Sequence, residues 1–167
     1  TEANPLPIGV TTPKNPAALP SNKQQTQPVV APITNHAAHA NPADEQISYL
    51  AAYELVKNKR FDDALTAMQK FVTQYPQGGY TANAQYWLGE LQMVKKNYPE
   101  AIAHFEVVLQ QFPSSSKSAA SMLKIGYALA ASGQKAEAIQ RLQQVLKNYP
   151  DTNTAQLAKA KLDALSS

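Results

Sequence analysis

The chain has no cysteine among its 167 residues. This excludes disulfides, thiolate metal ligands, a thiol nucleophile and a lipid-modified cysteine anchor in this sequence. Long apolar runs are missing as well, and none approaches the ~20 residues that a membrane-spanning helix needs. Residues 1–30 lack the basic start and apolar core of a secretory signal peptide. We therefore expect a mature or processed chain with no direct membrane insertion, and its compartment stays open at this point.

A strong excess of charge of one sign is also lacking. The net charge is +3, and from Asp44 onward 13 Lys and Arg face 11 Asp and Glu. Binding to nucleic acid draws its affinity from clustered basic residues that neutralise many phosphates together. The one tight basic group is Lys57, Lys59 and Arg60, which we interpret as a solvated helix end. No nucleic-acid partner is predicted.

Signatures of catalysis and of cofactor binding are scarce. The six glycines are dispersed and form no phosphate-binding loop. No pair of glutamates stands with a nucleophile or metal ligand at recognisable spacing; the candidates are Glu54, Glu90, Glu100, Glu106 and Glu137. His104 has apolar neighbours and is expected on the surface or packed, and His36 and His39 lack a third metal ligand. We predict no enzyme, no cofactor and no metal site.

The prolines divide the chain into two regions. Eight of the twelve lie within residues 1–43, where Pro, Ala and Asn dominate. Proline interrupts helices, and so few apolar residues do not offset the entropy of ordering the segment. We therefore predict a flexible linker over residues 1–43 and a folded, helical domain over residues 44–167.

The folded region contains an internal repeat with a step of 37 residues. Three sets of residues follow this step: Tyr75-Pro76, Phe112-Pro113 and Tyr149-Pro150; Ala64, Ala101 and Ala138; and Ala52, Gly89 and Gly126. Each unit reads as two helices that approach closely at the small residues, and the proline ends the second helix. The expected repeats are about 44–79, 80–116 and 117–153.

Apolar residues in the second helix of each unit recur with the spacing of an amphipathic helix. They are Leu65, Met68 and Phe71; Ile102, Phe105 and Val108; and Ile139, Leu142 and Val145. The expected helices are 45–58, 61–75, 80–96, 99–111, 116–132, 135–148 and 154–165. The last would cap the repeats with an apolar side formed by Leu157, Ala158, Leu162 and Leu165.

This arrangement resembles the tetratricopeptide repeat. The family pattern has a small residue, an alanine, a large residue four positions after the alanine, and a closing proline. The second unit matches it with Gly89, Ala101, Phe105 and Pro113, and the third with Gly126, Ala138, Leu142 and Pro150. The first unit matches it less closely, with Ala52, Ala64, Met68 and Pro76. The usual repeat has about 34 residues. The resemblance implies an all-α fold of three tetratricopeptide-like hairpins plus a C-terminal capping helix, in a right-handed superhelix preceded by a disordered linker.

Residues 44–167 are also similar to the C-terminal domain of the periplasmic Tol-Pal accessory proteins, the cell division coordinators of the YbgF/CpoB family. Tyr86-Trp87-Leu88-Gly89 and the turn at 112–119 carry this similarity. It implies a non-enzymatic periplasmic scaffold that binds TolA and couples outer-membrane constriction to septal peptidoglycan synthesis, with a peptidoglycan synthase as another partner. The family forms homotrimers through a coiled coil that is absent from this chain. An outer-membrane assembly factor, another periplasmic adaptor and a structural oligomerisation module are the alternatives.

The resemblance also implies a binding groove lined by the first helix of each unit. The repeat register places there Tyr49, Tyr53, Asn83, Tyr86, Glu90, Met93, Leu123 and Tyr127, with Val56 and Ala130 beside them. Tyrosines are common anchors at binding hot spots. The alternative for Tyr49, Tyr53, Tyr86 and Tyr127 is that some of them pack between hairpins. We expect Trp87 in the core. Cochaperones of this family grip a C-terminal carboxylate with Lys and Asn at positions held here by Tyr49 and Tyr53, so no such clamp is predicted.

Overall fold

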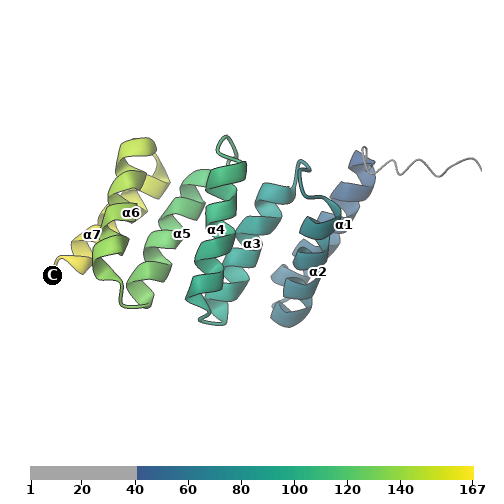
Figure 1. Ribbon diagram of the computed structural model, residues 1–167, viewed down its shortest axis with the longest axis horizontal. Helices are drawn as coiled ribbons and strands as arrows, with labels where there is room; N and C mark the ends of the chain where they lie inside the picture. Colours follow the sequence, from purple (N-terminus) through teal and green to yellow (C-terminus); the bar gives the residue numbers. More distant parts are fainter. Residues whose placement is uncertain (1–40) are drawn as a thin grey trace, which may run out of the picture. The chain divides into compact units, whose positions relative to one another are not determined.

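A computed structural model of the chain describes residues 41–167, which belong to one compact unit. Within these residues the fold is all α-helical, and each helix packs against the next in the chain (Figure 1). The helices are α1 (Pro42–Lys57), α2 (Phe61–Gln74), α3 (Thr81–Val94), α4 (Tyr98–Gln111), α5 (Ser118–Ala131), α6 (Lys135–Asn148) and α7 (Asn153–Leu165). The prediction of three hairpins and a final helix is confirmed.

The first helix begins at a local capping signal. The side chain of Asn41 accepts a hydrogen bond of 3.0 Å from the amide of Ala43, and Pro42 occupies the first helical turn. Asparagine caps helices well, and proline loses nothing there because the first amides have no partner within the helix. α1 thus starts two residues before the predicted domain boundary at Asp44. The rest of the predicted linker, with His36 and His39, lies outside the described residues.

The link between the two helices of each hairpin has one recurring conformation. Lys59, Lys96 and Gly133 follow the first helix at the 37-residue step, and all have a positive φ, of 57°, 59° and 83°. In the second hairpin the amide of Lys96 donates to the carbonyl of Met93, and that of Asn97 donates to Gln92. These two bonds define a Schellman motif. The motif ends α3 at Val94, two residues earlier than the apolar pattern predicts.

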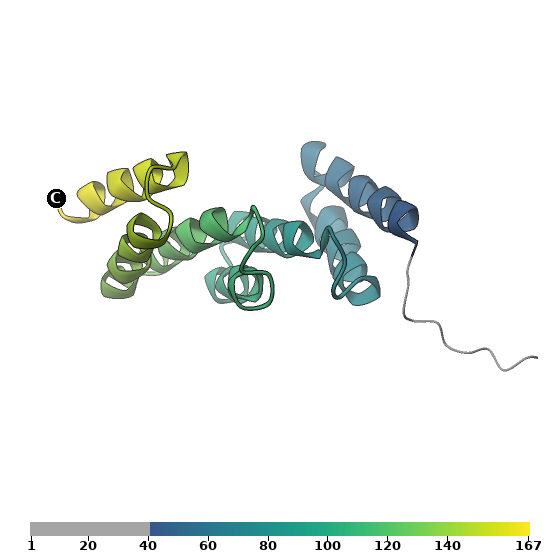
Figure 2. The same cartoon turned by 90° about the horizontal axis from the view of Figure 1, so that it is seen from above.

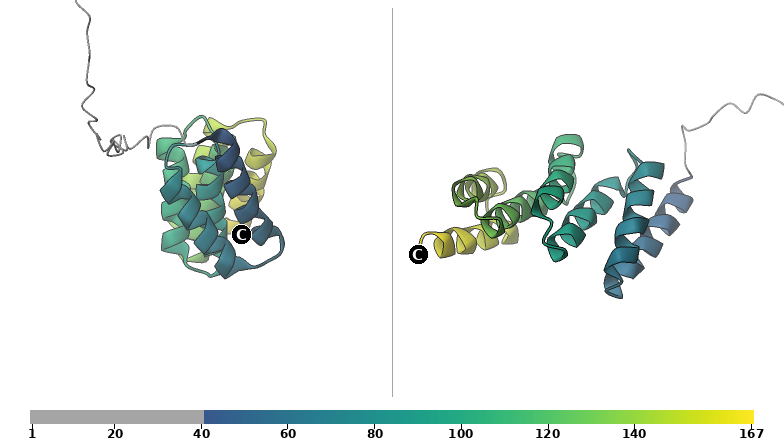
Figure 3. Two further views of the ribbon diagram at one scale, coloured as in Figure 1. Left: turned by 90° about the vertical axis from the view of Figure 1, so that its right-hand side faces the viewer. Right: turned by 60° about the horizontal axis from the view of Figure 1, so that its bottom comes forward.

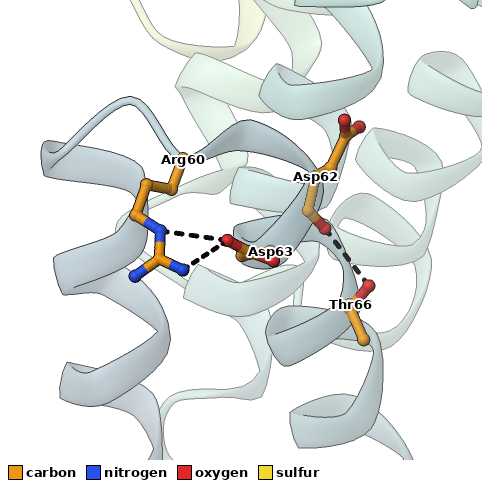
Figure 4. A network of polar contacts seen from close by, with 4 residues as sticks. All are labelled: Arg60, Asp62, Asp63 and Thr66. Atoms are coloured by element: carbon orange, nitrogen blue, oxygen red, sulfur yellow. Dashed lines mark hydrogen bonds and ion pairs between the residues drawn. The ribbon is translucent and has the colours of Figure 1, made fainter.

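The basic group at the end of α1 lies at such a link. Arg60 contacts Asp63 through two nitrogens, at 3.0 Å and 2.7 Å, and the Thr66 hydroxyl donates to the backbone carbonyl of Asp62 (Figure 4). Lys57 pairs with Glu54 at 2.6 Å, with both side chains more than half exposed. The interpretation of this group as a solvated helix end is confirmed, because Lys57, Lys59 and Arg60 are all exposed.

The links between hairpins are tied to the end of the preceding helix. Ser118 is almost fully buried, and its hydroxyl donates to the carbonyl of Phe112 at 3.0 Å. Thr81, 37 residues earlier, donates in the same way to Tyr75. Both carbonyls belong to residues that precede a proline, where the helical conformation is disfavoured. One side chain at the start of each following helix therefore satisfies a carbonyl at the end of the last.

The helices of each hairpin meet at small residues, as predicted. Ala64, Ala101 and Ala138 are fully buried. Across from them, large side chains fill the space beside Ala52, Gly89 and Gly126. The buried residues of the predicted stripes are Met68, Phe71, Phe105, Val108, Leu142 and Val145. At ~25 cal/mol per Å² of apolar surface removed from water, these layers supply the main stabilisation of the unit.

The final helix covers the last hairpin, because α7 packs against α5 and α6. On α7, Ala155 and Ala158 are buried, while Leu162 and Leu165 are partly buried. Leu157 is 52% exposed. Its prediction as part of the covering side is wrong, because the helix turns toward the hairpin along its alanines, which permit closer approach.

The first helices of the hairpins share one side of the unit. Figure 2 shows α1, α3, α5 and α7 along one side and α2, α4 and α6 along the other. The right panel of Figure 3 shows the helices succeeding one another from α1 at one end to α7 at the other. α1 and α7 rise on the same side, so α3 and α5 form the middle of a curved surface. Among residues 41–167, no helix combines the length and apolar character that crossing a bilayer needs.

Candidate partner-binding face

One position of the repeat recurs along the side formed by the first helices. Leu50, Trp87, Lys124 and Lys161 succeed one another at the 37-residue step, on α1, α3, α5 and α7. Neighbouring tyrosines and Lys117 lie within a turn of this row. We define the aromatic face as Tyr53, Tyr86, Trp87, Lys117, Lys124, Tyr127 and Lys161, together with Glu90.

Tyr49 organises the end of the aromatic face formed by α1 and α3. Its ring lies 6.1 Å from Tyr53 and 4.9 Å from Tyr80, both nearly parallel to it, and 5.8 Å from Phe71 at a steep angle. The indole Nε1 of Trp87 donates to the Tyr49 hydroxyl at 3.2 Å. Aromatic pairs at these separations add stabilisation beyond their buried area, so the rings are held in place before any partner arrives.

Two of the residues predicted to line the groove lie beneath its surface. Tyr49 is only 7% exposed and Leu123 only 3% exposed. Burial raises the pKa of the Tyr49 phenol above its usual value, against the opposing effect of the hydrogen bond from Trp87. Both residues therefore act as packing that supports the face. The open surface belongs to side chains on either side of them.

Tyr86 lies in the middle of the aromatic face. Its ring is 5.4 Å from Trp87 and 5.8 Å from the buried Phe105, and Lys117 Nζ lies 4.8 Å from its centroid. Burial, followed by the nearby Glu90 carboxylate, raises the pKa of Tyr86 to about 12. The phenol therefore stays neutral at physiological pH and offers a hydroxyl as donor and acceptor.

Trp87 packs against the buried cluster that contains Tyr49 and Leu88, so its prediction as a core residue is confirmed in part. It is only partly buried, its ring lies 5.3 Å from Tyr53, and Lys117 Nζ is 5.8 Å from its centroid. Helix geometry explains this position, since residue 87 follows Asn83 by one turn and precedes Glu90 by another. In the sequence, the 37-residue spacing that relates Trp87 to Leu50 and Lys124 is the signal that places it in the row along the first helices.

The α5 and α7 end of the face combines one tyrosine with two ammonium groups. Lys124 Nζ lies 5.8 Å and Lys161 Nζ 5.7 Å from the centroid of Tyr127, within the range of cation–π attraction. Lys124 also pairs with Glu90 Oε2 at 3.2 Å, with both side chains about a quarter exposed. The other oxygen, Glu90 Oε1, is buried and has no hydrogen-bond partner within the described residues.

The two remaining predicted residues lie at the margins. Asn83 is partly buried and lines an open pocket of about 480 Å³ between the turn at Gly78 and Gly79 and the serine-rich turn at 114–116. Met93 is partly buried and packs against the core that contains Ala101 and Phe105. Asn83 therefore borders the aromatic face, whereas Met93 contributes to the packing under α3.

Within residues 41–167 no group of three or more His, Asp or Glu side chains is placed to hold a metal ion. His104 packs as predicted, with its Nδ1 2.9 Å from Gln85 Oε1. Burial lowers the pKa of its imidazole, and Glu100 opposes that shift.

Comparison with curated sequences finds relatives named cell division coordinator CpoB. The protein from Pseudomonas putida is 47% identical over 55 residues, which are 33% of this chain and 20% of that protein. The one from Escherichia coli is 41% identical over 66 residues, which are 39% of this chain and 25% of that protein. The matched segment thus spans a quarter or less of the length of these relatives.

Comparison with solved structures finds the same fold in domains of low sequence identity. The second tetratricopeptide domain of human RPAP3, solved with the HSP70 peptide SGPTIEEVD, has a TM-score of 0.62 at 18% identity over 76% of this chain and 99% of that one. The first such domain of Spaghetti, bound to the HSP90 peptide SRMEEVD, has a TM-score of 0.64 at 16% identity over 77% and 95% of the two chains.

Family comparison agrees with the hairpin geometry. Tetratricopeptide repeat models match residues 49–116 and residues 95–162. The two matches overlap and together cover α2–α6 completely, with most of α1 and α7. With three hairpins at a constant step and the recurring layout of small residue, alanine and closing proline, the chain belongs to the tetratricopeptide repeat family.

Proposed function

We propose that this chain is a non-enzymatic scaffold of cell division that binds a partner protein through the aromatic face. In this proposal the helical domain that begins at Pro42 is the binding domain, and the residues before it are a linker. The alternatives are an outer-membrane assembly factor, another periplasmic adaptor and a structural oligomerisation module.

The observation that carries the proposal is the partial exposure of rings that are already fixed. Tyr53, Tyr86 and Trp87 are each partly buried and contact one another or Tyr49. Aromatic side chains with few rotatable bonds are typical of binding hot spots, because little entropy is lost when a partner covers them. A surface of this kind on the first helices of a repeat unit is suited to hold a peptide segment.

The setting rests on sequence similarity. Relatives named cell division coordinator share 41–47% identity with part of this chain. We infer from this that the partner belongs to the division machinery at the cell envelope, with TolA as the first candidate and a peptidoglycan synthase as the second. The same inference places the chain in the periplasm, where it would coordinate outer-membrane constriction with septal peptidoglycan synthesis.

Titration calorimetry of the full 167-residue chain against the periplasmic domains of TolA tests this proposal. We expect saturable binding that Tyr86→Ala weakens by about tenfold or more, the loss typical of a hot-spot ring. Tyr98→Ala, in the first turn of α4 and away from the aromatic face, is the matched control and should bind as the parent does. No binding at high micromolar concentration would rule out TolA as the direct partner, and the same titration would then be made with a peptidoglycan synthase.

A further inference from the structure

The aromatic face carries positive charge that the described residues leave partly unbalanced. Lys124 is paired with Glu90, but neither Lys117 nor Lys161 forms an ion pair with any residue from 41 to 167. Each of these two ammonium groups instead lies over a ring, Lys117 over Tyr86 at 4.8 Å and Lys161 over Tyr127 at 5.7 Å. Three lysines thus face one glutamate along this surface.

The ring contacts fix where those charges point. A lysine on an open surface loses considerable side-chain entropy when an ion pair immobilises it. Lys117 and Lys161 are partly buried and already rest on aromatic rings. Much of their side-chain entropy is therefore already lost on folding, before a partner binds. A carboxylate that arrives above them gains the attraction at a smaller entropic loss.

Exposed aliphatic side chains flank the same surface. Within the described residues, four large apolar side chains are strongly exposed, and all of them lie on first helices or on α7. Three of the four are within one turn of a member of the aromatic face: Leu50 of Tyr53, Val94 of Glu90, and Leu157 of Lys161. Side chains three or four residues apart share one side of a helix, so the face is bordered by apolar patches.

We propose that the aromatic face takes a protein segment in which acidic side chains alternate with apolar ones. This inference rests on the proposed scaffold function and specifies the chemistry of its partner. The acidic groups would pair with Lys117 and Lys161 and compete with Glu90 for Lys124, while apolar groups cover Leu50, Val94 and Leu157. Charge complementarity would set the register of the segment, and the apolar contacts would supply most of the affinity.

Single-stranded nucleic acid is the other polymer that binds lysines and aromatic rings together. The aliphatic borders favour protein, because leucine and valine offer a base neither stacking nor a charge. The basic residues also lack the continuous row that tracks a phosphate backbone, since Lys117, Lys124 and Lys161 lie on two helices with Tyr127 between the last two.

Selection from a random library of 16-residue displayed peptides, with the full chain as bait, tests the inference. We expect selected peptides to be enriched in Asp and Glu together with Leu, Phe or Trp, and depleted in Lys and Arg. The best peptide, labelled with fluorescein, should bind in an anisotropy titration and should weaken as salt is raised, because screening acts on its exposed charges. A copy with Asn and Gln in place of Asp and Glu should bind about tenfold more weakly.

Charge-matched variants locate the site. The triple variant Lys117→Gln, Lys124→Gln, Lys161→Gln should lower affinity for the acidic peptide by about tenfold or more, with an unchanged helical spectrum. The control triple, Lys135→Gln, Lys147→Gln, Lys159→Gln, removes the same charge at exposed positions on α6 and on the other side of α7 and should bind as the parent does. An equal loss of affinity in both triple variants would overturn the inference, because net charge alone would then explain the binding.

Further outcomes separate this inference from the function on which it rests. Selection of neutral or basic peptides, selection of none, or equally lysine-dependent binding of labelled oligothymidine would overturn the acidic segment. TolA that binds the lysine triple variant as tightly as the parent would keep the scaffold function and also overturn the acidic segment. Lysine-dependent binding of acidic peptides without binding of TolA would support the inference and remove TolA as the partner.

Discussion

Gly89 of α3 lies directly against the ring of Phe105 on α4. A methyl group placed on Gly89 would stand 2.4 Å from Phe105 Cε1. At the equivalent positions 37 residues further along the chain, a methyl group on Gly126 of α5 would stand 2.7 Å from a methyl carbon of Leu142 of α6. Phe105 and Leu142 are both fully buried. Neither ring nor methyl can move aside without disturbing the layer around it, so the glycines set the distance between the two helices of a hairpin.

Gly89→Ala should therefore destabilise the fold. Alanine favours a helix interior over glycine by ~1 kcal/mol, but overpacking a close-packed core costs about 1–3 kcal/mol, and three ring atoms are involved here. We expect a net loss of up to about 2 kcal/mol in the free energy of unfolding, measured with urea. Gly79→Ala, where no atom lies within 4 Å of the added methyl, is the control and should change little.

A compensating substitution tests the same cause. The first hairpin holds Ala52 and Met68 at the positions of Gly89 and Phe105. The double variant Gly89→Ala, Phe105→Met reproduces that pair, and the flexible thioether can yield to the methyl group. It should recover part of the loss. A double variant as unstable as the sum of its two single variants would contradict steric conflict between these two residues.

Two lysines at hairpin links hold a strained backbone conformation, and glycine in place of either should stabilise the fold. Lys59 and Lys96 adopt the left-handed conformation in which Gly133 stands at the equivalent place. That conformation costs a residue with a Cβ about 1–2 kcal/mol. Lys96→Gly should raise the free energy of unfolding by roughly 0.5–1 kcal/mol, since added freedom of the unfolded chain offsets part of the gain.

The reverse substitution is the matched experiment. Gly133→Ala introduces the same strain at a position where the methyl group meets no atom within 4 Å, so its effect is purely that of the backbone. It should lower the unfolding free energy by about 1–2 kcal/mol. If both substitutions shifted the urea midpoint in the same direction, conformational strain at the links would be the wrong explanation.

Tyr86 should matter for association more than for folding. Tyr86→Ala removes a ring that contacts Trp87, Phe105 and Lys117, and partner affinity should fall by about tenfold or more. Because the side chain is only partly buried, circular dichroism should still report the parent's helical content. Tyr86→Phe keeps the ring, and retained affinity would show that stacking outweighs the hydroxyl. Collapse of helicity in Tyr86→Ala would instead make it a core residue.

His104 makes stability depend on pH. Burial lowers the pKa of its imidazole below the usual 6.5, so below pH 6.5 the unfolded chain binds a proton more readily than the folded one. The free energy of unfolding contributed by this residue therefore falls as the pH drops through 6.5 and stops falling below the folded pKa. Thermal melts between about pH 5 and 7.5 should show a smaller pH dependence for His104→Gln.

The imidazole itself can be observed during that titration. The NMR signal of the His104 ring should titrate with a midpoint below 6.5. A midpoint at or above this value would contradict burial as the controlling influence, and would point to Glu100, which acts in the opposite direction.

The helices follow from the sequence because their signals are local. Prolines, small residues and a 3.6-residue apolar period repeat at a fixed step, and each helix end lies within three residues of its prediction. The depth of a side chain is not a local property. Tyr49 is buried because Phe71 of α2 and Tyr80, before α3, close around it, and the repeat register cannot reveal this.

The lysines of the aromatic face escaped prediction because their charges are far apart in the chain. A search for basic clusters finds Lys57, Lys59 and Arg60, which face solvent. Lys124 and Lys161 become neighbours of one tyrosine only when α5 and α7 pack together. The 37-residue step relates these two lysines to each other and to Trp87, and aligning the repeats by position recovers the row without a structure.

The recurring link gives this domain a natural unit of growth. Because every hairpin turns through the same link conformation between its two helices and packs mainly against its neighbours, its surroundings are nearly the same wherever it stands in the series. A copy of residues 80–116 placed after Ser116 would meet the partners that α5 and α6 already accept. Each added copy would extend the aromatic face by one more row. The length of partner chain that the domain can contact would therefore grow with the number of repeats.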